Sequence, residues 1–167
     1  MRHAKSDWDA DYDTDHERPL NERGRRSARL MGRLLEAIGL EPDHAISSTA
    51  ERARRTVELA AAAGRWSTTV VLEPGLYGRG PAHVLTVAAT APDVGSLMLV
   101  GHQPTWSVLV RQLTGESVDM KTASVAVVDL GAGAWSELPV ARGRLVELHH
   151  PRSYYGSEWD DVPGSSP

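Results

Sequence analysis

Two histidines and several arginines in the chain have the chemistry needed to bind and transfer a phosphoryl group. His3 directly follows Arg2. A neutral histidine nitrogen can attack phosphorus near pH 7 without first losing a proton, and water can later cleave the covalent phosphohistidine. Taken alone, a histidine near a terminus is more often a solvated side chain. The hypothesis that His3 is a nucleophile therefore depends on the residues that accompany it.

Arginines with suitable chemistry fall where a predicted strand passes into a predicted helix. Arg52 and Arg54 lie there, and planar guanidinium groups bind phosphate oxygens through paired hydrogen bonds. Backbone amides near Thr49, at the start of the helix, would add a partial positive charge. From the local sequence alone, the competing interpretation is that Arg52, Arg54 and Arg55 form a solvated helix face.

The second histidine, His102, follows a short apolar run and Gly101. A side chain at the end of a buried strand can project into a cleft, which would bring His102 to the same site. The competing interpretation is a histidine in a turn whose hydrogen bonds are satisfied locally.

The elements that would position these residues are visible as periodic patterns. Apolar residues at helical spacing predict the helices, and β-branched or apolar runs predict the strands. Asn21 is the predicted N-cap of the first helix and Gly39 its C-terminal stop. The predicted helices cover residues 21–39, 49–63, 81–91 and 103–113. The predicted strands cover residues 44–48, 70–72, 97–100, 124–130 and 144–149.

This order predicts one α/β domain in which helices pack on a largely parallel sheet. Ligands bind at the carboxyl ends of the strands in such sheets, which is where Ser48 and Gly101 fall. The domain is predicted to cover residues 1–150, and residues 151–167 are expected to form an irregular tail. The 167 residues suffice for one hydrophobic core.

Composition narrows the function classes. The formal charge of −4 argues against a general nucleic-acid surface. The absence of cysteine excludes disulfides, thiolate zinc sites and a cysteine nucleophile, and favours a reducing compartment. No apolar run approaches the ~20 residues of a membrane span and no signal peptide opens the chain, so we expect a cytoplasmic protein without membrane contact.

Two patterns raise the question of a metal site. Aspartates alternate from Asp7 to Asp15, like the ligands of a calcium loop. With Asp11 as the first ligand the sixth position is His16, where the sharp turn requires glycine, so the pattern predicts a solvated acidic loop at the rim of the site. Adjacent strand residues point to opposite faces, so His149 and His150 are predicted to be structural. We expect no metal and no cofactor.

Five segments, in this order, resemble the motifs of the histidine phosphatase superfamily. They are residues 2–6 (RHAKS), 18–24 (RPLNERG), 47–56 (SSTAERARRT), 76–78 (LYG) and 100–104 (VGHQP). The first looks like the Arg-His-Gly/Ala signature of that superfamily, and its Ala-Lys-Ser continuation resembles the small SixA-type branch of phosphohistidine phosphatases. The resemblance covers about residues 1 to 150. It implies a three-layer, phosphoglycerate mutase-like fold with helices on both faces of a mostly parallel sheet.

The resemblance also implies roles for individual residues. By it, His3 accepts the phosphoryl group, Arg2 and Arg52 clamp the phosphoryl oxygens, and His102 stabilises the charge that develops there. Arg18 matches the arginine of the Arg-Pro-Leu segment that lies beside the pocket. Ser48 and Gly101 are further candidates for substrate contacts.

The general acid that would protonate the leaving group is less well marked. Glu73, just before residues 76–78, is nearest to where the wider superfamily places a carboxylic acid. SixA-like members often depart from that pattern. The competing interpretation of Glu73 is a surface residue at the end of a strand.

The leading hypothesis is a cofactor-independent phosphatase that works through a phosphohistidine intermediate. Glu73 follows Arg52 by 21 positions and His102 follows Glu73 by 29, which leaves little chain for a lid. An open pocket suits protein phosphohistidine, with small phosphate esters or nucleotides as the alternative. A mutase, which must shield its phosphoryl group from water, is disfavoured. The oligomeric state is left open.

The rival hypothesis is a phosphate-binding module that has lost catalysis. It rests on the first strand of the family, an apolar run that leads into the Arg-His pair, which does not precede Arg2 here. Because this strand lies centrally in the sheet, its loss would expose unpaired backbone groups on two neighbours. We therefore expect that the natural product begins several residues upstream of Met1.

Overall fold

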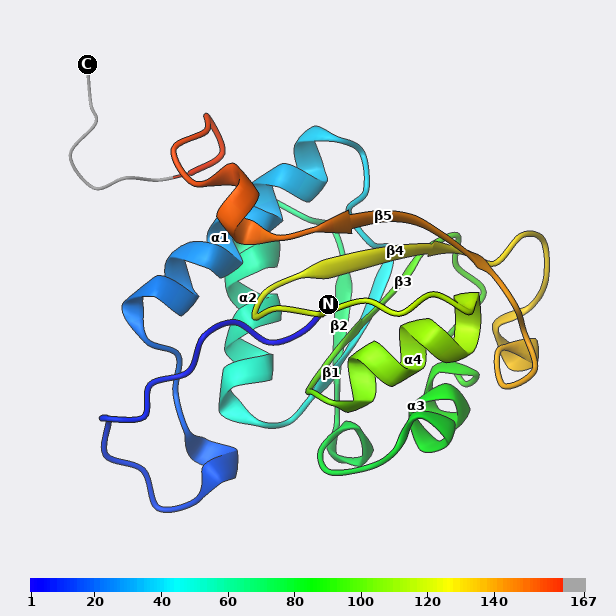
Figure 1. Cartoon of the computed structure of the whole chain (residues 1–167), viewed down its shortest axis with the longest axis horizontal. Helices are drawn as coiled ribbons and strands as arrows, with labels where there is room; N and C mark the ends of the chain where they lie inside the picture. Colours follow the sequence, from blue (N-terminus) through cyan, green and yellow to red (C-terminus); the bar gives the residue numbers. More distant parts are fainter. Residues whose placement is uncertain (161–167) are drawn as a thin grey trace.

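The computed structural model describes residues 1–160, in which strands and helices alternate along the chain (Figure 1). The helices are α1 (Glu22–Ala37), α2 (Glu51–Gly64), α3 (Pro81–Ala88) and α4 (Thr105–Thr114). The strands are β1 (His44–Ser48), β2 (Thr69–Glu73), β3 (Leu97–Val100), β4 (Val125–Asp129) and β5 (Arg144–His149). Short 3-10 helices are η1 (Asp15–Glu17), η2 (Pro74–Leu76), η3 (Trp135–Glu137) and η4 (Pro151–Tyr154). Among the described residues, no helix combines the length and the apolar character that a membrane span requires.

The strands form two hydrogen-bonded groups. β2, β1 and β3 lie in that order in a parallel sheet, and β4 pairs with β5 in the antiparallel sense. The opening residues lie between the two groups. The amide of His3 donates to the oxygen of Gly101 after β3 at 2.9 Å, and the amide of Arg2 donates to the oxygen of Ser124 before β4 at 3.0 Å. The first residues of the chain therefore take a central position between β3 and β4.

Met1 itself is buried inside this arrangement. Its ammonium group donates to the oxygen of Leu99 at 2.7 Å, and burial lowers its pKa to about 5. An apolar cavity of about 130 Å³ lies beside Met1, with Leu99 of β3 and Ala126 of β4 among the residues that line it.

Apolar residues pack on both faces of the strands, as predicted. Successive residues of a strand point to opposite faces. Ala45 accordingly packs with the cluster that contains buried residues of α1 and α2, and Ile46 with the cluster that contains buried residues of α3 and α4. β1 is buried along its whole length, as expected for the middle strand of a parallel sheet. The predicted α/β fold with helices on both faces is confirmed.

The packed part of the chain extends beyond the boundary predicted at residue 150. Residues 151–154 form η4, and Tyr154, Tyr155 and Trp159 pack against the cluster of α1 and α2. Arg26 of α1 forms an ion pair with the buried carboxylate of Asp160, with Nε 2.7 Å from Oδ1. The rest of the predicted irregular tail, residues 161–167, lies outside the described residues.

Candidate active site

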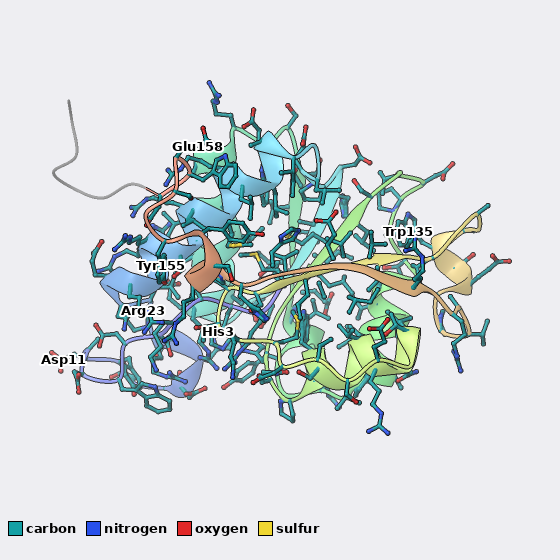
Figure 2. The ribbon with its side chains drawn as sticks, turned by 45° about the horizontal axis from the view of Figure 1, so that its top comes forward. His3, Asp11, Arg23, Trp135, Tyr155 and Glu158 are labelled. Carbon is teal, nitrogen blue, oxygen red and sulfur yellow. The ribbon has the colours of Figure 1, made fainter. Side chains whose placement is uncertain are left out.

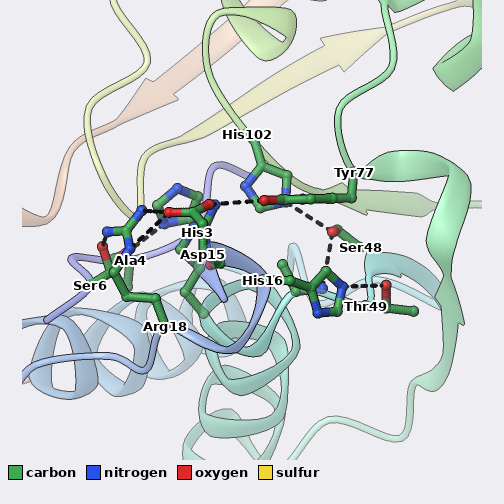
Figure 3. A network of polar contacts seen from close by, with 12 residues as sticks. His3, Ala4, Ser6, Asp15, His16, Arg18, Ser48, Thr49, Tyr77 and His102 are labelled. Atoms are coloured by element: carbon green, nitrogen blue, oxygen red, sulfur yellow. Dashed lines mark hydrogen bonds and ion pairs between the residues drawn. The ribbon is translucent and has the colours of Figure 1, made fainter. Parts of the chain in front are cut away.

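Three chain segments end side by side and carry the predicted site residues. β1 ends at Ser48, β3 is followed by Gly101 and His102, and the opening segment carries Arg2 and His3. The carboxyl ends of parallel strands form one edge of a sheet, and the side chains of His3, Ser48 and His102 lie close together there (Figure 3).

His3 is held in a single orientation. Its Nδ1 lies 2.7 Å from the backbone oxygen of Ala4. A carbonyl oxygen only accepts hydrogen bonds, so Nδ1 carries the proton and Nε2 of the neutral ring keeps its free electron pair. Burial lowers the pKa of His3 to about 3, the charges of His102, Arg52 and Arg2 act in the same direction, and the hydrogen bond to Ala4 opposes them. His3 is therefore neutral at physiological pH, as a nucleophile must be.

His102 faces His3, with 5.1 Å between the ring centroids. Its Nε2 lies 2.9 Å from the hydroxyl of Ser48, whose oxygen accepts a hydrogen bond from the amide of Ala50 at 3.2 Å. When this hydroxyl donates its proton to Nε2, Nδ1 of the neutral His102 ring carries the proton and is a donor. Burial and the charge of Arg52 lower the pKa of His102 to about 4. Ser48 thus positions His102 beside His3.

Gly101 contributes through its backbone and through its lack of a side chain. Its oxygen accepts the hydrogen bond from the amide of His3, and its amide donates to the oxygen of Met1 at 3.2 Å. A Cβ atom on Gly101 would lie 2.1 Å from the ring of Trp106. The lack of a side chain on Gly101 therefore lets Trp106 of α4 pack closely against the backbone. The hydrogen bond from the amide of His3 to Gly101 positions the backbone of His3 next to β3.

Asp15 connects two of the predicted arginines. Its Oδ1 accepts hydrogen bonds from Arg18, with Nη2 at 2.7 Å, and its Oδ2 accepts one from Nη2 of Arg52 at 2.9 Å. Nη1 of Arg18 also donates to Ser6, and Nη1 of Arg52 donates to the backbone oxygen of Asp15 at 2.6 Å. Burial alone would raise the pKa of Asp15, but hydrogen bonds from Arg18 and Tyr77 and the charge of Arg52 outweigh it and lower the pKa to about 2. Asp15 is thus an ionised carboxylate that orients both guanidinium groups.

Three residues of this network were not predicted as site residues. Asp15 appeared in the sequence only as part of the acidic loop. Tyr77 donates from its hydroxyl to Oδ2 of Asp15 at 2.9 Å and meets the ring of His102 edge-on, with centroids 5.3 Å apart. His16 lies 5.0 Å from Tyr77 between ring centroids and 2.9 Å from the hydroxyl of Thr49. The available signals were the spacing of Asp15 three residues before Arg18 and the position of Tyr77 inside the Leu-Tyr-Gly segment.

Three buried nitrogen atoms at the site have no hydrogen-bond partner among the described residues. They are Nε of Arg2, Nε of Arg52 and Nδ1 of His102. The same three residues are those whose charges lower the pKa of His3. Arg2 is anchored by Nη1, which donates to the oxygen of Met120 at 2.8 Å. Buried donors without an acceptor are costly, so this cluster is suited to bind an anion next to His3.

Glu73, Arg54 and Arg55 were also candidates from the sequence, but they lie outside the polar network around His3. Glu73, at the end of β2, accepts a hydrogen bond from the amide of Gly75 at 2.7 Å and so caps η2. No hydrogen bond or ion pair joins its carboxylate to the histidines or arginines of the site within residues 1–160. Arg54 and Arg55 form ion pairs with Glu58, and Arg54 also pairs with Glu51, on the outer face of α2. These two arginines form the solvated helix face that was the competing interpretation.

No group of three or more histidine, cysteine, aspartate or glutamate side chains within residues 1–160 is placed to hold a metal ion. The adjacent histidines at the end of β5 have separate partners. Nδ1 of His149 lies 2.7 Å from the hydroxyl of Tyr154, and Nδ1 of His150 lies 2.7 Å from the hydroxyl of Ser124.

Comparison with known proteins identifies the same superfamily that the five sequence motifs resemble. Residues 1–80 match the model of the histidine phosphatase superfamily, branch 1. The chain is similar to a solved structure from Agrobacterium tumefaciens assigned to the phosphohistidine phosphatases SixA, with 30% identity, a TM-score of 0.77, and 90% and 94% of the two chains covered. It is also similar to a protein histidine phosphatase SixA complexed with tungstate, with 26% identity, a TM-score of 0.74, and 92% and 96% covered.

A relative from Mycobacterium tuberculosis strain H37Rv, an uncharacterized protein, is 35% identical over 166 residues, which covers 91% of this chain and all of that protein. Such identity over the whole of a relative, together with the SixA structures, extends the likeness well beyond the first 80 residues. The order of the five motifs, the fold and these similarities agree, and the chain belongs to the histidine phosphatase superfamily, in its SixA-type branch.

Proposed function

We propose that this protein removes phosphate from protein phosphohistidine in two steps, through a phosphohistidine on His3. The observation that carries the proposal is the cluster of unpartnered buried nitrogens on Arg2, Arg52 and His102 around a neutral His3. Phosphoryl oxygens are the acceptors that such a cluster fits best, because guanidinium groups bind them with charge-assisted hydrogen bonds.

In the first step Nε2 of His3 attacks phosphorus in line with the leaving group. The new bond joins Nε2 to phosphorus, and the bond from phosphorus to the leaving nitrogen breaks. The electron pair of that bond stays on the leaving nitrogen, which takes up a proton from the general acid or from water and departs in a neutral imidazole. Arg2, Arg52 and His102 stabilise the negative charge on the phosphoryl oxygens, which is the largest contribution that a protein makes to phosphoryl transfer. Nδ1 of His3 keeps its proton throughout, and that proton remains hydrogen-bonded to the backbone oxygen of Ala4.

In the second step water attacks the same phosphorus atom. The water oxygen bonds to phosphorus and gives up a proton to the solvent, the bond between phosphorus and Nε2 breaks, inorganic phosphate leaves, and the electron pair returns to Nε2 of His3. The protein thereby regains its starting state and consumes one water molecule per turnover.

Protein phosphohistidine is favoured over a phosphate ester for two reasons. The side chain of Asp15, next to the arginines, is 49% exposed, so a phosphorylated side chain on another protein has access to the site. Imidazole leaves phosphorus more readily than an alkoxide does, so a phosphohistidine substrate tolerates a weak general acid. Glu73 remains our candidate for that acid, although its carboxylate caps η2 in this state.

The test compares phosphate release from a phosphohistidine peptide and from p-nitrophenyl phosphate. We expect the wild type to hydrolyse the peptide and to form an acid-labile phosphoryl label during turnover. His3→Asn should lose both signals. His83→Asn is the matched control, because His83 is an exposed histidine of α3 outside the site.

Equal rates in His3→Asn and the wild type would remove His3 as the nucleophile. Turnover of p-nitrophenyl phosphate without turnover of the peptide would assign the protein to small phosphate esters. A folded wild type that binds phosphate and hydrolyses neither compound would identify a binding module.

A further inference from the structure

A polar cavity of about 580 Å³ opens beside the candidate active site, with Arg2 among the residues that line it. Six basic residues line it: Arg2, Lys5, Arg23, Lys121, His150 and Arg152. We call this cavity the basic groove. Its walls come from the opening segment, the first turn of α1, the loop before β4 and the turn after β5.

Three of the six basic residues of the groove have no acidic partner among the described residues. No aspartate or glutamate of residues 1–160 is among the residues that line it. Asp119 forms an ion pair with Lys121 and interacts electrostatically with Arg2 and His150. None of the ion pairs within the described part of the chain involves Lys5, Arg23 or Arg152. These three side chains are exposed. A concave surface with one sign of charge concentrates the field toward an anionic ligand, unlike a mixed surface of paired charges.

Arg2 links the groove to the chemistry. Its side chain lines the groove, and its charge lowers the pKa of both His3 and His102. A ligand that fills the groove therefore has one end next to the phosphoryl group on His3. Hydrogen bonds join residues of the groove walls. Nε of Arg23 donates to the hydroxyl of Tyr155 at 3.5 Å (Figure 2), and Nδ1 of His150 lies 2.7 Å from the hydroxyl of Ser124.

The acidic loop gives the substrate a direction. Asp7, Asp9, Asp11 and Asp13 lie between the opening segment and η1, and Asp11 is exposed. In Figure 2 Asp11 lies at the outer end of this loop, and Arg23 and Tyr155 lie between Asp11 and Glu158. Acidic side chains of a substrate would be repelled by the acidic loop and attracted by the basic groove. An asymmetric distribution of charge on the substrate would fix its orientation.

We propose that the basic groove binds acidic side chains that flank the phosphohistidine on one side of the protein substrate. The inference rests on the proposed function and specifies which phosphoproteins it serves. A single carboxylate would not fill about 580 Å³. The basic residues also come from four separate chain segments, so an extended acidic segment matches them better than one small anion.

The test measures binding separately from catalysis. Two unphosphorylated peptides with a central histidine are labelled with a fluorophore, one with glutamates and one with glutamines on the same side. Lys5→Gln/Arg23→Gln/Arg152→Gln removes three exposed charges of the groove and leaves Arg2 in place. Arg111→Gln/Arg142→Gln/Arg144→Gln removes three charges from α4 and from the opposite end of β5, and is the matched control.

We expect the wild type and the control to bind the glutamate peptide about tenfold more tightly than the glutamine peptide at low salt, as three exposed charge pairs allow. The groove variant should lose this difference, and raised salt should weaken the preference in the wild type. Turnover of p-nitrophenyl phosphate, which does not reach the groove, should stay within about twofold in all three proteins.

Equal preference in the groove variant and the wild type would overturn the proposal, as would a wild type without preference for the glutamate peptide. Preference for the glutamate peptide without hydrolysis of its phosphorylated form would leave the groove assignment in place and contradict the proposed function instead.

Discussion

The hydroxyl of Ser48 is the contact that holds His102 beside His3. Ser48→Ala removes it, and Nε2 of the buried ring loses its partner. We expect kcat for p-nitrophenyl phosphate to fall about tenfold with KM nearly unchanged, since loss of one hydrogen bond at the reacting centre corresponds to roughly 1 to 1.5 kcal/mol.

Ser47→Ala is the control for this prediction. The hydroxyl of Ser47 donates to the backbone oxygen of Ser48 and lies equally deep in β1. A similar loss of kcat in both variants would mean that Ser48 acts through the stability of β1 and not through His102.

A substitution of Glu73 tests whether this residue is the general acid. Its carboxylate accepts the amide of Gly75, so Glu73→Ala should lower the free energy of unfolding by about 1 kcal/mol through loss of a cap. With p-nitrophenyl phosphate, whose leaving group needs no proton, kcat should change less than about threefold. If the phosphohistidine peptide shows a much larger loss of kcat than this ester, Glu73 is the acid of the physiological reaction.

Among the elements, α1 and α2 pack unusually closely. A Cβ atom on Gly32 of α1 would lie 2.0 Å from the backbone oxygen of Ala60 in α2. Gly32→Ala should therefore push the helices apart and lower the free energy of unfolding by about 1 to 3 kcal/mol in urea titrations, despite the better helix propensity of alanine. Gly80→Ala is the control, because nothing lies within 4 Å of its added methyl group. Equal stability of Gly32→Ala and the wild type would show that α1 and α2 can move apart freely.

Most elements could be predicted from the sequence because their signals are local. β1, β3 and β5 have the predicted bounds, since short apolar runs end at polar or turn residues. Asn21 caps α1 as expected, with its Oδ1 accepting from the amide of Gly24 at 2.8 Å. α4 begins at Thr105 and not at the predicted Gln103, because the side chain of Gln103 accepts from the amide of Ser107 and acts as a cap.

Other features depend on contacts between distant residues, which local patterns do not contain. Asp15 binds Arg52, 37 positions away, and its neighbours in the acidic loop look identical in sequence. Residues 151–160 pack on α1 through apolar side chains and through the ion pair of Arg26 with Asp160, 134 positions apart. Composition alone predicted an irregular tail there.

For the whole molecule, the buried neutral histidines make stability depend on pH. An unfolded chain protonates His3 and His102 below a pKa of about 6.5, whereas the folded protein does so only near 3 and 4. Between these values the unfolded state binds more protons, so stability falls as the pH falls. Asp15 adds a further loss only below 3.8.

The loss at pH 5 relative to pH 7 should be about 2 kcal/mol for each buried histidine. Thermal melts of the wild type between pH 7.5 and 4.5 should show this decline, and His3→Asn should show a shallower one. His83→Asn should match the wild type. Parallel curves for His3→Asn and the wild type would contradict the assignment of a neutral, buried His3.

The burial of Met1 has a practical consequence for anyone who handles the protein. The nitrogen of Met1 donates to the oxygen of Leu99 within the sheet. Residues fused ahead of Met1 would start in the interior, between β3 and β4, beside a cavity of about 130 Å³. The sequence of such a fusion would thus act as core sequence: apolar, β-branched residues are suited to this position, and a charged affinity tag joined directly to Met1 is not.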